Sequence, residues 1–365
     1  MPYLHAGNDL WRRIREAGMG CVSVMGLAKN TGKTVTLNHL LAQAAADGVA
    51  VGLSSIGRDG EARDAVFDFP KPPVLVWPGT LVATARSTLA RAVPSLRIVV
   101  ATGITSPMGE IVIVRALEPG AMEVAGASRG ADQRRLIDRL VCCGASQVFL
   151  DGALGRSQHA TPALADGVVL ATGAALGGSI ADVLRKTRDR IRLLGIPQAD
   201  AGVRAACGAL FMSGGVALWR PEGDLLFEAA VPSLNAAPLL LEHAQGPVGM
   251  LACSGAVGQG LWQAFEVLAQ RYPGLVLVVA DGTRLFVEAT DLNRLQARGA
   301  SLVAMRPIHI AGITLNPFSP LGATFDPASF VEAAARALPE HAVTDVLWPP
   351  GPSSTGEETH GRIAA

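Results

Sequence analysis

Short apolar runs alternate with longer Ala- and Leu-rich stretches along most of the chain. The apolar runs, such as Val49–Ser54 and Gln147–Leu150, have the length and composition of buried strands. The longer stretches, such as Thr34–Ala46 and Ile180–Leu194, have the spacing of helices. Because this alternation is typical of β-α-β units, the pattern predicts an α/β fold with a mostly parallel sheet.

The pattern defines the individual elements that we expect. Strands are predicted at Cys21–Met25, Val49–Ser54, Val74–Val76, Arg97–Val100, Gln147–Leu150, Gly167–Leu170, Val216–Trp219, Leu225–Phe227, Val248–Ala252, Leu275–Val279, Leu302–Met305 and Ile310–Leu315. Helices are predicted at Thr34–Ala46, Thr80–Ala92, Asp132–Val141, Ile180–Leu194, Leu261–Arg271, Leu292–Arg298 and Ser329–Leu338. Glu110–Val114 and Met122–Val124 flank a Pro-Gly turn, which predicts a hairpin between them.

The alternation pauses near Gly195–Pro197, where a Gly- and Ala-rich stretch follows. We therefore expect two domains, a nucleotide-binding domain over residues 1–200 and a second α/β domain over 201–347. A length of 365 residues agrees with two domains. The segment 348–365 contains Pro-Pro-Gly-Pro and Ser-Ser-Thr-Gly, which predicts a flexible tail.

Composition excludes several classes of protein. The chain has 31 basic and 31 acidic residues and no block of like charge, which argues against a nucleic-acid-binding surface. A mean hydropathy of +0.33 raises the question of a membrane protein, but the longest apolar stretches are too short or too broken to span a bilayer. The N-terminus lacks the apolar core of a signal peptide, and the five cysteines show no C-x-x-C spacing. We expect a cytoplasmic protein without structural zinc.

The segment Cys21–Thr34 reads CVSVMGLAKNTGKT and leads directly into a helical pattern. A strand, a glycine-containing turn and a helix that opens with Gly-Lys-Thr form the arrangement of a P-loop, in which backbone N–H groups hold phosphate oxygens. Lys33 would neutralise the β- and γ-phosphates, and the Thr34 hydroxyl would bind Mg²⁺. The remaining nucleotide-binding candidates are Gly26, Lys29, Asn30, Thr31 and Gly32. The alternative is an ordinary helix N-terminus.

Two acidic segments are candidates for the metal and for catalysis. Asp151 ends the apolar strand Gln147–Leu150, as the acid of a Walker B strand does. Asp59 and Glu61 follow the strand after the P-loop helix. Because Mg²⁺ bound to nucleotide prefers carboxylate and water ligands, we expect Asp151 at the metal, and Asp59 or Glu61 either at the metal or at the attacking water. The alternatives are a turn at Asp59 and a solvated helix cap at Glu61.

Five residues, rather than the usual four, separate Gly26 from Gly32. In this the loop resembles dethiobiotin synthetase, a member of the class that also contains MinD and the nitrogenase iron protein. The resemblance implies ATP and Mg²⁺ as ligands. In MinD-like members a signature lysine reaches the partner's phosphates, so Lys29 acts either in its own subunit or across a homodimer. Gly52–Ser55 lacks the lysine that binds carbamate in dethiobiotin synthetase, which puts carboxylation in doubt.

The segments MGLAKNTGKTVTLN, SSIGRDGE, FLDGALGRSQHATPALADGVVLATGAA and TLNPFSPLGATFDPASFVEAA together resemble the B subunit family of the lysine 5,6-aminomutase reactivases. This implies an ATPase chaperone that reactivates a cobalamin-dependent aminomutase together with a MutS-related ATPase. An ATP-dependent ligase of the dethiobiotin synthetase type and a regulatory module without hydrolysis remain as alternatives. No Asn-Lys-x-Asp sequence is present to read guanine, so ATP is expected, while the sequence leaves GTP open.

Overall fold

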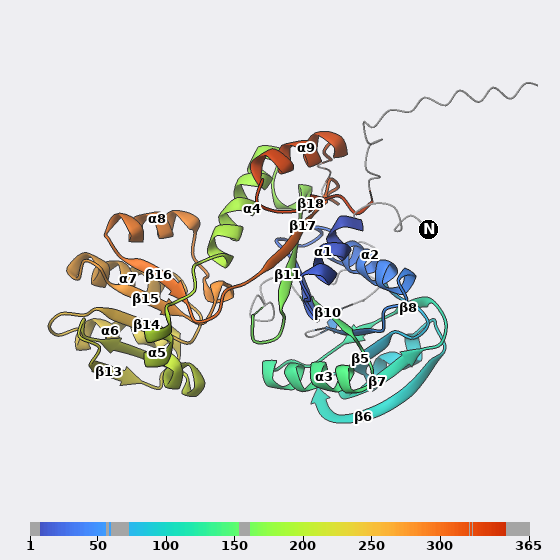
Figure 1. Ribbon diagram of the computed structural model, residues 1–365, viewed down its shortest axis with the longest axis horizontal. Coiled ribbons are helices and arrows are strands. Elements are labelled where there is room, and N and C mark those ends of the chain that lie inside the picture. Colours follow the sequence, from blue (N-terminus) through green and yellow to red (C-terminus); the bar gives the residue numbers. More distant parts are fainter. Residues whose placement is uncertain are drawn as a thin grey trace, which may run out of the picture.

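The structure is a computed structural model that describes residues 8–55, 58–59, 73–152, 161–320, 322 and 324–347. Two large sheets, each with its own helices, form two lobes (Figure 1). Figure 1 shows the chain passing from one lobe to the other twice, through α4 (Ile180–Leu194) and again before β17 (Ile310–Asn316). The fold is therefore α/β with a large, mostly parallel sheet, as the sequence pattern predicts.

The first sheet has nine strands, and the strand that precedes the glycine-containing loop is central. The strands from β18 to β5 pair in parallel, whereas β7 and β6 are antiparallel to their neighbours. The order is β18 (Val343–Thr344), β17, β11 (Gly167–Gly173), β1 (Cys21–Gly26), β10 (Gln147–Gly152), β2 (Val51–Ser55), β5 (Leu81–Ala85), β7 (Gly109–Ala116) and β6 (Leu96–Ser106).

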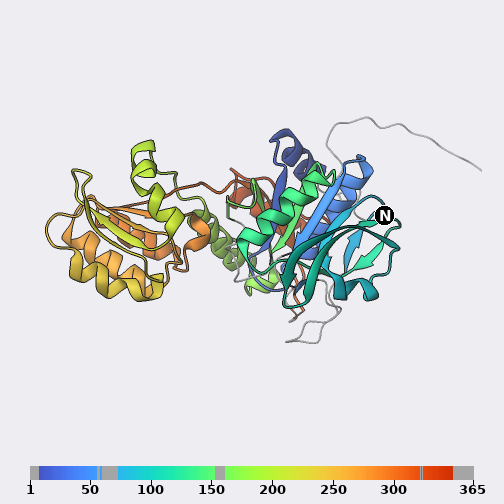
Figure 2. The ribbon, with the colours of Figure 1, turned by 90° about the horizontal axis from the view of Figure 1, so that it is seen from below.

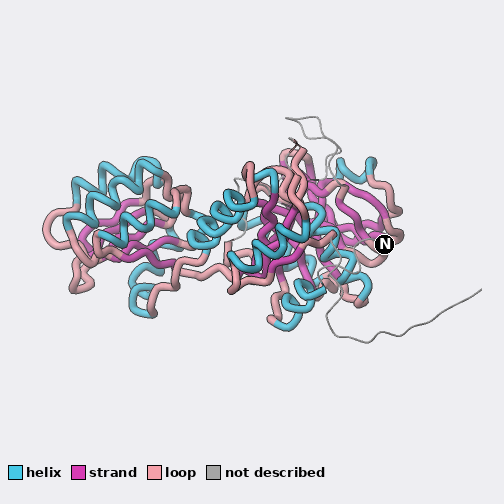
Figure 3. The backbone as a smooth tube through the Cα atoms, turned by 90° about the horizontal axis from the view of Figure 1, so that it is seen from above, coloured by secondary structure: helices cyan, strands magenta, loops and turns pink. Residues whose placement is uncertain are grey.

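Helices cover both faces of this sheet, as Figure 3 shows. On one face α1 (Asn8–Glu16) and α2 (Lys33–Ala46) pack with β1, β2 and β10 around Val22, Leu37 and Phe149. On the other face α3 (Gly130–Cys142), α4 and α9 (Pro327–Ala337) cover the same strands and their neighbours. Burial on both faces explains why most residues of the parallel strands are apolar.

The second lobe contains a five-stranded sheet in the order β13 (Leu225–Ala229), β12 (Val216–Trp219), β14 (Met250–Cys253), β15 (Val276–Val279) and β16 (Ser301–Ala304). Its helices are α5 (Ala201–Ser213) on one face and α6 (Ala236–His243), α7 (Gln259–Arg271) and α8 (Ala289–Ala297) on the other. Figure 2 shows this lobe apart from the first, with helices packed against its sheet. The predicted strands Val216–Trp219 and Leu225–Phe227 are confirmed as β12 and β13, which pair antiparallel.

The C-terminal boundary of the second lobe differs from the expected range 201–347. β17 pairs with β11, and β18 pairs with β17, so both belong to the first sheet. α9 packs through Phe330 and Ala334 on the same sheet. The second lobe is thus inserted between α4 and β17 of the first, because the chain returns to complete the large sheet. The predicted tail from 348 to 365 lies outside the described residues.

Two predicted elements are wrong. Thr80–Ala92 is not a helix, because it forms β5 followed by the 3-10 helix η1 (Arg86–Arg91). The partner of β7 is β6 and not the Met122 segment, which instead forms β8 (Gly120–Met122) and pairs with β4 (Val74–Val76). In both cases tertiary pairing outweighs the local pattern. Among the residues that the structure describes, no helix combines the length and the apolar character needed to cross a membrane.

Candidate functional site

The loop between β1 and α2 lies at the carboxyl edge of the first sheet. All residues of β1 are buried, and Leu27 N–H still donates to the Ala171 carbonyl of β11. The loop then turns through Asn30 (φ 62°) and Gly32 (φ 87°), both in the left-handed region. Gly32 immediately precedes α2, which has no side-chain cap and no acidic residue in its first turn. The first N–H groups of α2 therefore remain available to an anion.

Lys33 is held at the end of the neighbouring strand β10. Its Nζ lies 2.7 Å from Asp151 Oδ1 and donates to the Gly152 carbonyl at 2.7 Å. Asp151 is buried (1% exposed), and its backbone is in register with Val24 of β1 and Ser55 of β2. The structure thus brings together a lysine and an acid that are far apart in the sequence, as the P-loop interpretation requires.

The loop is also tied to the strand that follows the second lobe. Asn316, the last residue of β17, donates from Nδ2 to the Asn30 carbonyl at 2.8 Å. Its Cβ faces Gly32 so closely that a side chain at Gly32 would contact it at 3.1 Å. The hydroxyls of Thr36 and Thr314 are 2.6 Å apart. The shape of the loop therefore depends on residues of β17.

The other predicted nucleotide-binding residues occupy different environments. Thr31 is buried and donates to the Ala28 carbonyl at 3.0 Å, so its hydroxyl shapes the loop. Lys29 is exposed on the outer part of the loop. Thr34 is the second residue of α2 and is half-buried. Gly26 lies under the loop, where a Cβ would contact the Thr31 hydroxyl at 2.9 Å.

The second acidic segment is described only in part. The backbone of Asp59 belongs to β3 (Arg58–Asp59), in which it pairs with Val124 of β9 (Val124–Ala125). The side chain of Asp59 and all of Glu61 lie outside the described residues. Whether these two carboxylates reach the loop stays a prediction.

The donor set at the loop fits Mg²⁺. The Asp151 carboxylate and the Thr34 hydroxyl are hard oxygen ligands, and Mg²⁺ beside phosphate needs only one or two such protein ligands. Within the described part of the chain no three His, Cys, Asp or Glu side chains form a cluster that would hold a metal by themselves. A metal here would accordingly depend on phosphate oxygens and water for the rest of its coordination.

A cavity of ≈ 160 Å³ opens beside the first turn of α2. It is lined by Gly32, Val35, Thr36, Leu315, Asn316, Pro317, Phe318, Pro327, Asp345, Val346 and Leu347. Phe318 is 56% exposed although it is large and apolar, and Asp345 is buried. The cavity lies on the β17–β18 side of the loop, opposite Lys33 and Asp151 on the β10 side.

Two features of the structure were not predicted from the sequence. The contact of Asn316 with the loop is one, because Asn316 is 286 positions from Asn30 and its segment TLNPFSPLGATFDPASFVEAA gives no indication of that contact. Ser23, Ser54 and Gln133 are buried polar residues whose hydroxyl or amide atoms have no hydrogen-bond partner within the described chain. Buried polar groups of this kind cost stability and are uncommon in folded proteins. Ser54 lies near the carboxyl end of β2, where the sequence lacks the lysine of dethiobiotin synthetase.

Comparison with known proteins adds no assignment. No family model, no curated protein and no solved structure matches the chain.

Proposed function

We propose that the protein is a P-loop NTPase that binds Mg–ATP at the loop between β1 and α2. The observation that carries the proposal is the position of Lys33, within 2.7 Å of both Asp151 Oδ1 and the Gly152 carbonyl at the uncapped N-terminus of α2. On nucleotide binding, Lys33 would contact the β- and γ-phosphates, and Asp151 would hold the metal through water.

The arrangement of the strands supports one orientation for the nucleotide. With Lys33 and Asp151 at the β- and γ-phosphates, these groups would lie on the β10 side of the loop. The base would then extend toward β17 and β18, where the ≈ 160 Å³ cavity lies. Phe318 and Pro317 offer apolar contact to a planar ring, and an exposed aromatic side chain is a favourable stacking partner for a base.

We further propose that hydrolysis drives the reactivation of a cobalamin-dependent aminomutase, together with a MutS-related ATPase. The resemblance of four sequence segments to the reactivase B subunit family supports this part of the proposal. The architecture is compatible with it, because the second lobe is connected to the first by α4 and β17, and Asn316 of β17 contacts the loop. A change at the phosphates would thus reach the element that leads back from the second lobe.

Calorimetric titration and a phosphate-release assay test this function. We expect Mg-dependent binding of ATP to the purified protein, with GTP as the comparison nucleotide. Phosphate release should be slow for the protein alone and faster when an aminomutase of the lysine 5,6 type is added. No nucleotide binding would contradict the P-loop assignment. Stimulation by a small carboxylate or amine, without any protein partner, would instead favour an ATP-dependent ligase.

A further inference from the structure

A larger cleft, of ≈ 640 Å³, lies between the two lobes. This volume is within the usual range for a small-molecule site. One wall comes from the first lobe and contains Met25, Gly26 and Leu27, Leu176 of the 3-10 helix η3 (Ala174–Leu176), and the α4 residues Arg185, Lys186, Asp189, Arg190 and Leu193. The other wall is the segment 285–290 of the second lobe, which leads into α8.

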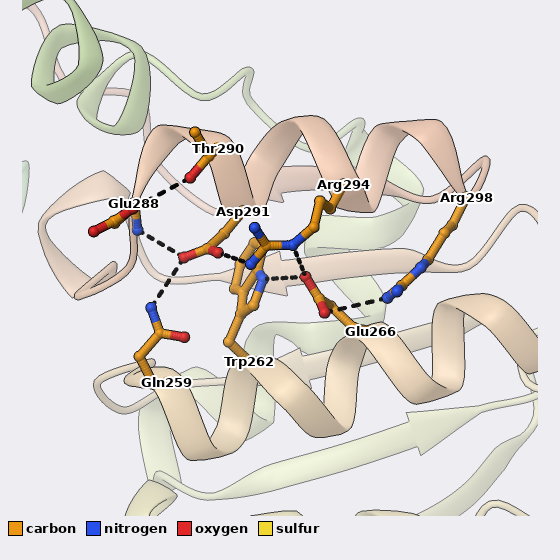
Figure 4. A network of polar contacts seen from close by, with 8 residues as sticks. All are labelled: Gln259, Trp262, Glu266, Glu288, Thr290, Asp291, Arg294 and Arg298. Carbon is orange, nitrogen blue, oxygen red and sulfur yellow. Dashed lines mark hydrogen bonds and ion pairs between the residues drawn. The ribbon is translucent and has the colours of Figure 1, made fainter.

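The wall formed by the second lobe is firmly held. The buried Asp291 accepts from the Glu288 backbone N–H at 2.8 Å and from Gln259 Nε2 at 3.0 Å, and it also pairs with Arg294 (Figure 4). Phe286 N–H donates to the Val257 carbonyl at 2.9 Å. Phe286 nevertheless remains 43% exposed, and it lines the cleft together with Leu285 and Val287. The wall thus presents a fixed apolar surface to the opposite lobe.

Arg190 of α4 spans the two walls. Its Nη1 donates to the Leu285 carbonyl at 3.1 Å, and this is its only hydrogen bond within the described part of the chain. A guanidinium has five N–H donors, so most of its donor capacity is unused in a half-buried position. Asp281 lies near Arg190, but its two carboxylate oxygens already accept from Thr161 and Thr283.

The other charged groups of the cleft are engaged locally. Asp189 pairs with Arg185 at 3.3 Å, and Lys186 lies 2.8 Å from Asp182 and donates to the Leu176 carbonyl. The Glu288 side chain takes part in the capping box of its own helix, α8. Three cations, Arg185, Lys186 and Arg190, therefore line the cleft against two carboxylates that are already in use.

We propose that this cleft binds a small organic anion with an apolar body. Arg190 would bind the anionic group through its unused N–H donors, because a guanidinium suits a carboxylate or sulfonate. The apolar body would lie between Phe286 with Val287 on one wall and Met25 with Leu27 on the other. The bound molecule would contact both lobes as well as Leu27, at the start of the loop. Since no step involves the nucleotide, this site stands apart from the proposed NTPase function.

Displacement of a fluorescent probe tests the proposal. Anilinonaphthalene sulfonate has an aromatic body and one anionic group, and its fluorescence rises in an apolar site. We expect octanoate to displace it from the full-length protein at about tenfold lower concentration than octanol, since the two share a tail but only octanoate offers a charge-assisted hydrogen bond to Arg190. Equal displacement by the two compounds, or no probe binding, would overturn the proposal.

Matched variants locate the site. Arg190→Gln should abolish the preference for octanoate over octanol, whereas Arg188→Gln, on the outer side of the same helix, should preserve it. Should Arg190→Gln fail to fold, Arg190→Lys keeps the charge and should retain part of the preference.

Phe286→Ala should lower the affinity for both octanoate and octanol. Met212→Ala, at another exposed apolar residue, should leave both affinities unchanged. An unchanged preference in Arg190→Gln would refute the assignment, and Lys33→Ala should leave the preference intact even where ATP binding is lost.

Discussion

The two lobes contain similar strand–loop–helix units. In the first lobe the buried strand β1 leads through Gly26–Gly32 into α2, and in the second the buried strand β14 leads through Ser254–Gly258 into α7. Each helix has glycine at its N-cap, no side-chain cap and no acidic residue in its first turn. By backbone features alone, both units offer an anion site.

The side chains separate the two units. At the start of α2, Lys33 reaches the buried Asp151 of the adjacent strand. At the start of α7, Gln259 donates to the buried Asp291, which is also tied to the α8 backbone and to Arg294 (Figure 4). The first unit therefore holds a cation beside an acid, whereas the second uses its acid to join two helices. We therefore expect the nucleotide at the first unit, where a cation lies at the uncapped N-terminus of the helix.

The largest expected effect is at Lys33. Lys33→Ala should lower ATP affinity by about 100-fold or more, because it removes the charge that would face the β- and γ-phosphates in the proposed complex. Gln259→Ala, the same position in the second unit, is the matched control and should bind ATP as the wild type does. Calorimetric titration measures both affinities. An equal loss of ATP affinity in the two variants would contradict the assignment of the nucleotide to the first unit.

Lys33→Ala also leaves Asp151 buried without its cation, so its free energy of unfolding should fall. The double variant Lys33→Ala with Asp151→Asn should recover much of that stability in urea unfolding, because the buried charge is gone. Its ATP affinity should stay as low as that of Lys33→Ala, which separates the loss of affinity from the loss of stability.

Asp291→Ala should lower the stability of the protein without changing its ATP affinity. The carboxylate is 2% exposed and accepts from two partners besides its pairing with Arg294, so we expect a loss of about 2 kcal/mol in the free energy of unfolding. ATP affinity should not change. Urea unfolding and calorimetric titration on the same sample check the two halves of this prediction. A fall in ATP affinity at constant stability would contradict the structural role of Asp291.

Asn316→Ala should lower ATP affinity by about tenfold, because the loop loses the bond from Asn316 Nδ2 to the Asn30 carbonyl and becomes less ordered. The Asn316 side chain also accepts a hydrogen bond from Phe318 N–H through its Oδ1. Asn316→Asp is the control for that bond, since it keeps this oxygen but removes the Nδ2 donor that reaches the Asn30 carbonyl. If the donor bond is the one that matters, both variants should lose affinity to a similar extent in titration.

Local sequence patterns predicted the elements whose apolar spacing is visible within a short stretch of chain. The strand Cys21–Met25, the helix from Thr34 and the strands Val216–Trp219 and Leu225–Phe227 are of this kind, and the structure contains them. The return of β17 to the first sheet and the contact of Asn316 with the loop depend on residues far apart in the sequence. No local pattern encodes such a pairing. The role of Arg190 could likewise not be predicted from the sequence, because its position between the two lobes depends on how the lobes meet.

The smallest expected effect concerns the cap of α9. The backbone N–H of Ser329 lowers the pKa of Asp326. A lowered pKa in the folded state stabilises the protein above the ordinary carboxyl pKa of about 3.9, and this contribution is lost as the pH falls through the lowered value. The difference in Tm between wild type and Asp326→Ala should be constant near neutral pH and shrink below about pH 4. A difference that grows on acidification would contradict this sign.

The most direct test of the central claim is a crystal structure with Mg²⁺ and a non-hydrolysable ATP analogue. The account predicts the β- and γ-phosphates against Lys33 at the start of α2, the metal beside Thr34 and Asp151, and the base in the cavity lined by Phe318. Phosphates at the Ser254–Gly258 loop of the second lobe, or placed away from Lys33, would contradict it.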